Sequence, residues 1–206
     1  MDTVVTPVRL AVLGRLARGI AARAAAVHVL RVAVDGPFGA GKSTFTRALD
    51  DALRPHLPPG REVRRFDTDM YMIRGRVHRA PAAADPQWLY DNVYDLGKVR
   101  AVAEGPAYGP PAVVLVDGMG LQRPELADLW DLVLYLHVPE KVTLDRMRAR
   151  RAELEADGMD LEPLYRDRYL PVARLYQQQV DPAARADVLV DMHDADQPVV
   201  VRWGGL

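Results

Sequence analysis

An α/β fold with a mainly parallel central sheet, covered by helices on both faces, is what the sequence predicts. Three observations support it. Short continuous apolar runs recur along the chain, segments with helical spacing lie between them, and the first run passes into a glycine-rich turn followed by a helix. Continuous apolar runs are typical of strands buried on both faces, and strands that alternate with helices form right-handed βαβ crossovers. We therefore expect a three-layer α/β/α sandwich.

The N-terminal third supplies two helices and two strands of this fold. Residues 7–26 have amphipathic spacing, and arginines interrupt this run too often for a signal peptide or a membrane span. The apolar run 30–35 is typical of a buried parallel strand. The helix that follows carries Phe45, Leu49 and Leu53 on one stripe and ends at a proline-rich stretch. The predicted elements are a helix over 7–26, a strand over 30–35, a helix over 42–54 and a strand over 62–66.

The rest of the chain first loses and then regains this alternation. Prolines and mixed polar and aromatic residues over 67–109 indicate short helices and loops. Apolar runs then return between charged segments with helical spacing, so the sheet continues. The predicted elements are strands over 112–116, 132–138 and 187–191, an edge strand over 199–203, and helices over 124–130, 139–156 and 162–180.

Composition bounds the function. The 206 residues, 49% of them apolar, suffice for one substantial core, so we expect a single domain over 1–206 with an N-terminal helix within 1–29. The 27 basic and 28 acidic residues nearly cancel, which favours a small-molecule partner over nucleic acid or a membrane surface. Without cysteine there is no disulfide and no thiolate chemistry, which fits a reducing cytoplasm. The oligomeric state stays open, and a homo-oligomer is possible.

The strongest motif is a phosphate-binding loop. Residues 36–43 match G-x-x-x-x-G-K-[ST], and they stand between a predicted buried strand and a predicted helix, as this motif requires. Lys42 would lie between the β and γ phosphates, and Ser43 would offer its hydroxyl to Mg²⁺. We therefore predict binding of ATP, or of another nucleoside triphosphate, with Mg²⁺. The predicted contacts are Gly36, Pro37, Phe38, Gly39, Ala40, Gly41, Lys42, Ser43 and Thr44.

The loop alone does not decide among kinases, GTPases and motor ATPases. Residues 117–120 fit the D-x-x-G of GTPases, but no Asn-Lys-x-Asp for guanine recognition follows. The chain is also too short for the additional elements of most motor or transport ATPases. These two observations favour a small-molecule kinase.

The sequence resembles the uridine kinase family and its relatives pantothenate kinase, nicotinamide riboside kinase and phosphoribulokinase. The resemblance extends from about residue 30 to about residue 196. It is carried by five segments: Val34-Asp35-Gly36 before the loop, residues 67–71 (DTDMY), residues 114–118 (VLVDG), residues 168–171 (RYLP) and residues 181–191 (DPAARADVLVD). The resemblance implies transfer of the γ-phosphate to a hydroxyl, first of all the 5′-hydroxyl of uridine or cytidine. It also implies an acceptor-binding insertion over about 67–110 and a lid helix over about 140–160.

The same resemblance suggests roles for three acidic residues. Family members carry an aspartate two positions before an aromatic residue, beside the acceptor hydroxyl. Asp69 fits this spacing and is the predicted general base, with Asp67 as the alternative. The competing interpretation is a polar turn after a strand. Asp117 ends a predicted central strand where family members place an acidic residue near Mg²⁺, and the alternative is a simple turn cap.

The charged helix over 139–156 resembles the arginine-bearing lid of this family. Arg146 and Arg150 lie four residues apart on one face, which suits them to clamp a phosphoryl group. Charge-rich helices are also simply solvated, and Asp145 and the acidic residues at 153 and 155 are available as ion-pair partners. Both interpretations stay open.

The acceptor pocket is predicted to come from the irregular segment around residues 70–95. Aromatic and imidazole rings there could stack on a flat ring, and charged groups could hold sugar hydroxyls or an anion. The candidates are Tyr71, His78, Trp88 and Tyr94 for stacking, Asp85 and Arg76 for polar contacts, and Asp67 beside the acceptor.

The Phe-Asp-His-Pro motif that surrounds the ribose-binding aspartate in well-described uridine kinases is missing around Asp85. The acceptor therefore stays open: pantothenate, nicotinamide riboside, another sugar alcohol or an antibiotic hydroxyl are alternatives to a pyrimidine nucleoside. A regulatory protein that binds a nucleotide without transferring phosphate is the alternative from another class.

Overall fold

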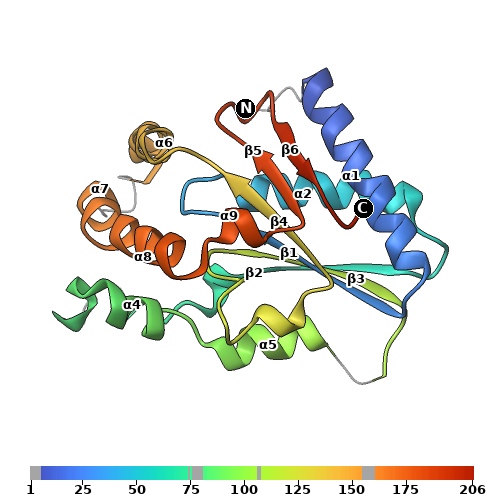
Figure 1. Ribbon diagram of the computed structural model, residues 1–206, viewed down its shortest axis with the longest axis horizontal. Helices are drawn as coiled ribbons and strands as arrows, with labels where there is room; N and C mark the ends of the chain where they lie inside the picture. The colour runs from blue at the N-terminus through green and yellow to red at the C-terminus, as the bar shows by residue number, and fades with distance from the viewer. Residues whose placement is uncertain (1–5, 74, 76–80, 106–107, 155–160) are drawn as a thin grey trace.

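A six-stranded sheet forms the centre of the protein (Figure 1). The computed structural model describes residues 6–73, 75, 81–105, 108–154 and 161–206. Strand order is β2-β3-β1-β4-β5-β6, and all neighbouring strands are parallel except β6, which pairs antiparallel with β5. The strands are β1 (Val29–Asp35), β2 (Glu62–Asp67), β3 (Ala112–Gly118), β4 (Leu132–His137), β5 (Val188–Asp191) and β6 (Val199–Trp203).

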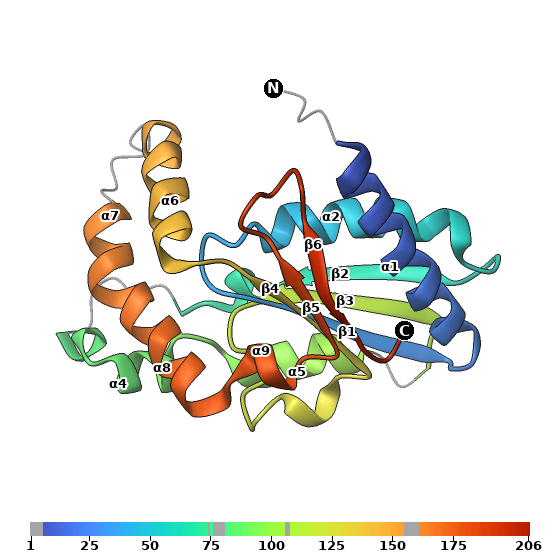
Figure 2. The ribbon, with the colours of Figure 1, turned by 45° about the horizontal axis from the view of Figure 1, so that its top comes forward.

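Helices cover both faces of this sheet (Figures 1 and 2). One face packs against α1 (Pro7–Ala25) and α2 (Lys42–Leu53) through a cluster that includes Leu16, Phe45 and Leu134. The other face packs against α5 (Leu96–Glu104). A third cluster joins α4 (Pro86–Asn92) to α8 (Leu170–Val180). The remaining helices are α6 (Glu140–Leu154), α7 (Leu161–Leu164) and α9 (Pro182–Arg185), with short 3-10 turns over Arg54–His56, Thr68–Tyr71, Pro81–Ala84 and Ala127–Leu129. The predicted three-layer α/β/α sandwich is confirmed.

The register of the central strands brings their carboxyl ends to one edge. Asp35 of β1 lies opposite Gly118 of β3, and Asp67 of β2 lies opposite Asp117 of β3. Ligands of open α/β sheets bind outside the carboxyl ends of the strands. This edge therefore collects the acidic residues at the carboxyl ends of three separate strands, Asp35, Asp67 and Asp117.

Two predicted helices differ in the structure. Residues 124–130 form no helix beyond the 3-10 turn Ala127–Leu129. Leu126 and Leu129 are buried as part of a loop against α5, and the Trp130 ring nitrogen closes this loop by donating to the Leu121 carbonyl oxygen over 2.6 Å. The apolar spacing over 124–130 thus reflects a buried loop and not a helix.

The helix predicted over 162–180 is composite. It runs from α7 through a π-helical turn, η6 (Tyr165–Tyr169), into α8. Pro171 at the start of α8 has no N–H to donate to the preceding turn, so the regular ladder is interrupted there. Among the described residues, no helix is long and apolar enough to cross a membrane.

Candidate functional site

The glycine-rich loop links β1 to α2 at the carboxyl edge of the sheet. Gly41 is the N-cap residue of α2 and has a φ of 81°, in the left-handed region that glycine adopts without a steric penalty. No side chain caps this helix. The N–H groups of its first turn are consequently available to an anion, and the helix dipole favours negative charge at this point.

The two polar side chains of the motif converge on the acidic edge. Lys42 Nζ lies 2.9 Å from the Pro37 carbonyl oxygen, so the ammonium folds back over the loop. Burial lowers the pKa of Lys42, while the carboxylates of Asp69, Asp35, Asp117 and Asp67 oppose that shift. Ser43 donates to Asp117 and also lies within hydrogen-bond distance of Asp67.

Asp117, Asp67 and Ser43 form the candidate magnesium site. Ser43 Oγ is 2.7 Å from Asp117 Oδ2 and 3.0 Å from Asp67 Oδ2. Burial raises the pKa of Asp117 to about 6, an effect that the Ser43 hydrogen bond reduces and the Asp67 charge increases. Hard oxygen donors of this kind suit Mg²⁺, which usually keeps several waters and takes further ligands from phosphate. The described residues contain no group of three or more His, Asp or Glu side chains that could hold a metal ion.

Asp69 lies in the same cavity as the loop. This cavity has a volume of about 600 Å³. The Asp67 side chain caps the turn Thr68–Tyr71 by accepting from the Asp69 N–H over 2.9 Å, and the Tyr94 hydroxyl lies 3.3 Å from Asp69 Oδ1. The cavity is lined by Phe38, Gly39, Gly41, Lys42, Ser43, Thr44, Arg47, Asp67, Asp69, Arg146 and Met147.

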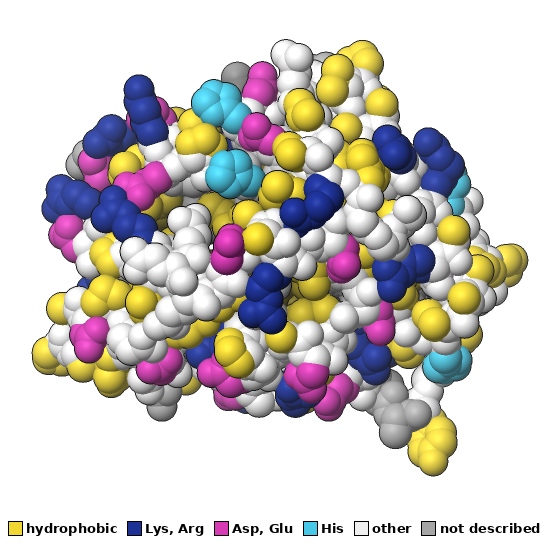
Figure 3. Space-filling model, in the orientation of Figure 1, with side chains coloured by type: hydrophobic (Ala, Val, Ile, Leu, Met, Phe, Trp, Pro, Cys, Tyr) yellow, Lys and Arg dark blue, Asp and Glu magenta, His cyan; other side chains and the backbone are white. Residues whose placement is uncertain are grey.

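Of the two predicted lid arginines, Arg146 reaches the site. Its guanidinium lies 2.7 Å from the Met192 carbonyl oxygen and 3.4 Å from that of Gly39 in the loop, and burial lowers its pKa. Arg148 instead pairs with Asp145 and Glu162 near the surface, as in a solvated helix. Figure 3 shows basic side chains gathered over α6 with acidic ones among them. Arg150 belongs to α6, but its side chain lies outside those described.

The predicted acceptor residues that the structure describes lie in separate parts of the fold. Tyr94 is buried beside Asp69, whereas Tyr71 packs into the cluster under α5 and Trp88 packs against the cluster between α4 and α8. The Asp85 side chain accepts from the Gln87 N–H over 2.9 Å and thereby caps α4. Arg76 and His78 lie outside the described residues.

Sequence reasoning missed several residues of this region. Arg47 and Met147 line the cavity, and Asp35 sits buried directly before the loop. The signal for Asp35 was present, because an acidic residue that ends a continuous apolar strand requires partners. No local pattern identifies Arg47 or Met147.

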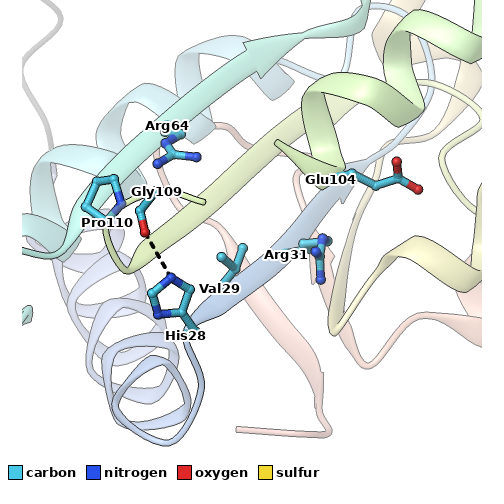
Figure 4. Close-up of a pocket in the computed structure, with 7 residues that line it drawn as sticks. All are labelled: His28, Val29, Arg31, Arg64, Glu104, Gly109 and Pro110. Carbon is cyan, nitrogen blue, oxygen red and sulfur yellow. Dashed lines mark hydrogen bonds between the residues drawn. The ribbon is translucent and has the colours of Figure 1, made fainter. Parts of the chain in front are cut away.

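A second cavity of about 400 Å³ lies at the opposite edge of the sheet (Figure 4). The His28 ring nitrogen lies 3.0 Å from the Gly109 carbonyl oxygen there. Its two arginines already have acidic partners: Arg31 with Asp131 and Arg64 with Glu62. Among the described residues that line it, both arginines are therefore compensated by carboxylates, unlike the convergent charges at the loop.

Comparison with known proteins agrees with this geometry. The sequence profile of one family, described as an AAA domain, matches residues 32–162, more than half of the chain. The chain belongs to the AAA domain family. The match spans β1 to α6 of this AAA-domain chain, including the loop, the acidic edge and Arg146. A search of curated proteins gives no match.

Two solved structures share the fold of this AAA-domain chain. A "Possible Uridine Kinase from Bacillus stearothermophilus" superposes with a TM-score of 0.57 at 18% identity, covering 85% of this chain and 98% of that one. A "putative fructose transport system kinase from Silicibacter sp. TM1040" does so with a TM-score of 0.57 at 20% identity, covering 81% and 94%. The α/β P-loop NTPase fold that the sequence predicted is confirmed, and at these identities the likeness is one of fold.

Proposed function

We propose that the protein is an ATP- and Mg²⁺-dependent small-molecule kinase that transfers the γ-phosphate to a hydroxyl. The 5′-hydroxyl of a pyrimidine nucleoside, uridine or cytidine, is the first candidate acceptor. The observation that carries the proposal is that Asp69 and the phosphate-binding loop line one cavity. A protein that only sensed nucleotides would need no carboxylate there.

Each group of the cavity has a place in this reaction. The acceptor oxygen bonds to the γ-phosphorus while the bond to the β–γ bridging oxygen breaks, Asp69 takes the hydroxyl proton, and ADP leaves. Lys42 and the N-terminus of α2 hold the phosphates, and Arg146 neutralises charge from the lid side. Ser43, Asp117 and Asp67 would hold Mg²⁺, which neutralises phosphate charge when bound.

The test measures ADP release from Mg·ATP with wild type and Asp69→Asn across uridine, cytidine, other nucleosides, pantothenate and nicotinamide riboside. We expect one acceptor to stimulate turnover over a low basal ATPase rate, and Asp69→Asn to lower the stimulated turnover by about 10²-fold. An Asp69→Asn variant that retains full acceptor-stimulated turnover would contradict the assigned base. ATP binding without stimulation by any acceptor would favour the sensing function.

A sugar hydroxyl is the second candidate acceptor. One structural neighbour is described as a fructose transport system kinase, and the Phe-Asp-His-Pro motif of uridine kinases is missing here. Fructose and other sugars therefore belong in the same panel. Stimulation by a sugar but by no nucleoside would retain the chemistry and replace the acceptor.

A further inference from the structure

One helical segment contacts the phosphate-binding loop and the residue directly before it with three tyrosines. The Tyr165 hydroxyl donates to the Phe38 carbonyl oxygen over 3.1 Å, and the Tyr169 ring stacks on the Phe38 ring with centroids 4.4 Å apart. The Tyr176 hydroxyl donates to the Asp35 carboxylate. Positions 165, 169 and 176 recur at helical spacing and so share one face. The loop is therefore held at its tip and at its base by one element.

Asp35 is the base of this arrangement. Its carboxylate is fully buried and accepts from the N–H of Gly36, the N–H of Gly120, the Gln122 amide and the Tyr176 hydroxyl. All four partners donate, so the geometry fits the ionised carboxylate, although burial raises the pKa of Asp35. An apolar side chain at position 35 could be buried in this strand without any hydrogen-bond partners. The network instead fixes the first amide of the loop.

The same helical segment follows the lid. Arg148 of α6 pairs with Glu162 of α7 over 3.1 Å, and the segment then continues through η6 into α8. Since π-helical turns occur frequently at functional sites, the position of η6 directly against the loop is notable. The lid and the loop are thus joined by one continuous element.

We propose that Tyr165, Tyr169 and Tyr176 are positioning residues, which hold the loop, through Phe38 and Asp35, in the form that binds the phosphates of the nucleotide. The part that concerns ATP rests on the proposed function. The part that concerns the loop conformation does not.

The test uses the full chain with Tyr176→Phe, which removes only the hydroxyl, and Asp35→Asn as a second variant. Tyr90→Phe is the matched control, because Tyr90 is also buried, stacks beside Tyr176 and has a hydroxyl with no partner among the described residues. Without nucleotide, hydrogen exchange of the amides of Gly36 and of residues 38–42 should be about tenfold faster in Tyr176→Phe and unchanged in Tyr90→Phe. Equal exchange in all variants would overturn the proposal.

Mg·ATP binding supplies the second measurement. Tyr176→Phe should raise Kd and KM for ATP by about tenfold with a smaller change in kcat, while Tyr90→Phe should match wild type. Faster loop exchange with unchanged ATP affinity would overturn the link to nucleotide binding. If wild type binds no nucleotide, the proposed function fails, while the hydrogen-exchange result still decides the positioning role.

Discussion

The proposed phosphate side of the cavity, residues 36–44, and its proposed acceptor side, which includes Asp67, Asp69 and Tyr94, are built in different ways. The proposed phosphate side comes from nine consecutive residues, 36–44, and the Asp35 carboxylate directly before them accepts four hydrogen bonds. The acceptor side comes from a 3-10 turn and short helices. Among the predicted residues that the structure describes, Asp67, Asp69 and Tyr94 lie together, while Asp85 caps a helix. A site formed by contiguous residues can be predicted from a sequence motif, whereas a site formed by side chains from separate elements cannot.

The largest expected effect falls on the phosphate side. Lys42→Ala should lower phosphoryl transfer by roughly 10³-fold, because the ammonium that neutralises phosphate charge is lost, while the fold remains intact. ADP release measures phosphoryl transfer, and circular dichroism shows whether the fold is intact. Lys98→Ala removes an exposed lysine paired with Asp95 and should change turnover little. A fully active, folded Lys42→Ala protein would refute the nucleotide site.

The next effect separates two aspartates of the acceptor side. Asp69→Asn should lower the acceptor-stimulated kcat by about 10²-fold and leave ATP affinity near wild type, because only proton transfer is impaired. Asp85→Asn should change kcat little, since asparagine caps a helix as well as aspartate does. Steady-state kinetics of both variants with the stimulating acceptor measures this. A tenfold rise of the acceptor KM in Asp85→Asn would instead favour the acceptor contact that the family resemblance implies.

Gly118→Ala tests whether the two sides depend on one close contact. A Cβ at Gly118 would lie 1.9 Å from Oγ1 of Thr68, which is buried and carries the turn between Asp67 and Asp69. The turn must shift, and we expect a loss of about 1–3 kcal/mol in unfolding free energy together with lower turnover. Urea unfolding measures the change in unfolding free energy. Gly75→Ala is the control, because a Cβ there meets no atom of the described residues within 4 Å. An equal loss in both variants would contradict the contact.

The difference between contiguous and dispersed residues also explains how much of the fold could be predicted from the sequence. The strands β1, β3 and β4 were predicted because their continuous apolar runs are buried on both faces. The loop was predicted because its residues are contiguous. The helix over 124–130 was wrong because loop burial gave the same spacing as a helix face.

The network around Asp35 was missed for a different reason. Its partners come from residues 36, 120, 122 and 176, so they meet only after the sheet and α8 have assembled. The acceptor side has the same difficulty. Tyr71 and Trp88 are aromatic residues near the right segment, yet their rings fill core clusters, and sequence alone does not separate a stacking ring from a packing ring.

The smallest expected effect concerns the anchor of the acceptor side. Arg123 is buried, donates to the Tyr90 carbonyl oxygen of α4 and forms two bonds to Glu125, at 2.9 and 3.0 Å. Glu125→Gln should lower the unfolding free energy at pH 7 by about 1 kcal/mol, since Glu125 is half exposed and screening weakens the pair. Glu104→Gln is the control, because Glu104 belongs to an exposed pair and Arg100 keeps Asp128.

The pH dependence of this difference tests its electrostatic origin. Arg123 lowers the pKa of Glu125 below its ordinary value of 4.5. A depressed carboxyl pKa stabilises the folded state above the unfolded pKa, and this contribution is lost as pH falls through the folded value. Urea unfolding of wild type and Glu125→Gln should therefore differ at pH 7 and converge as pH falls below about 4. A difference that persists unchanged in acid would mean that Glu125 holds α4 through packing and not through charge, and the acceptor side would then lack the electrostatic anchor that the phosphate side has in Asp35.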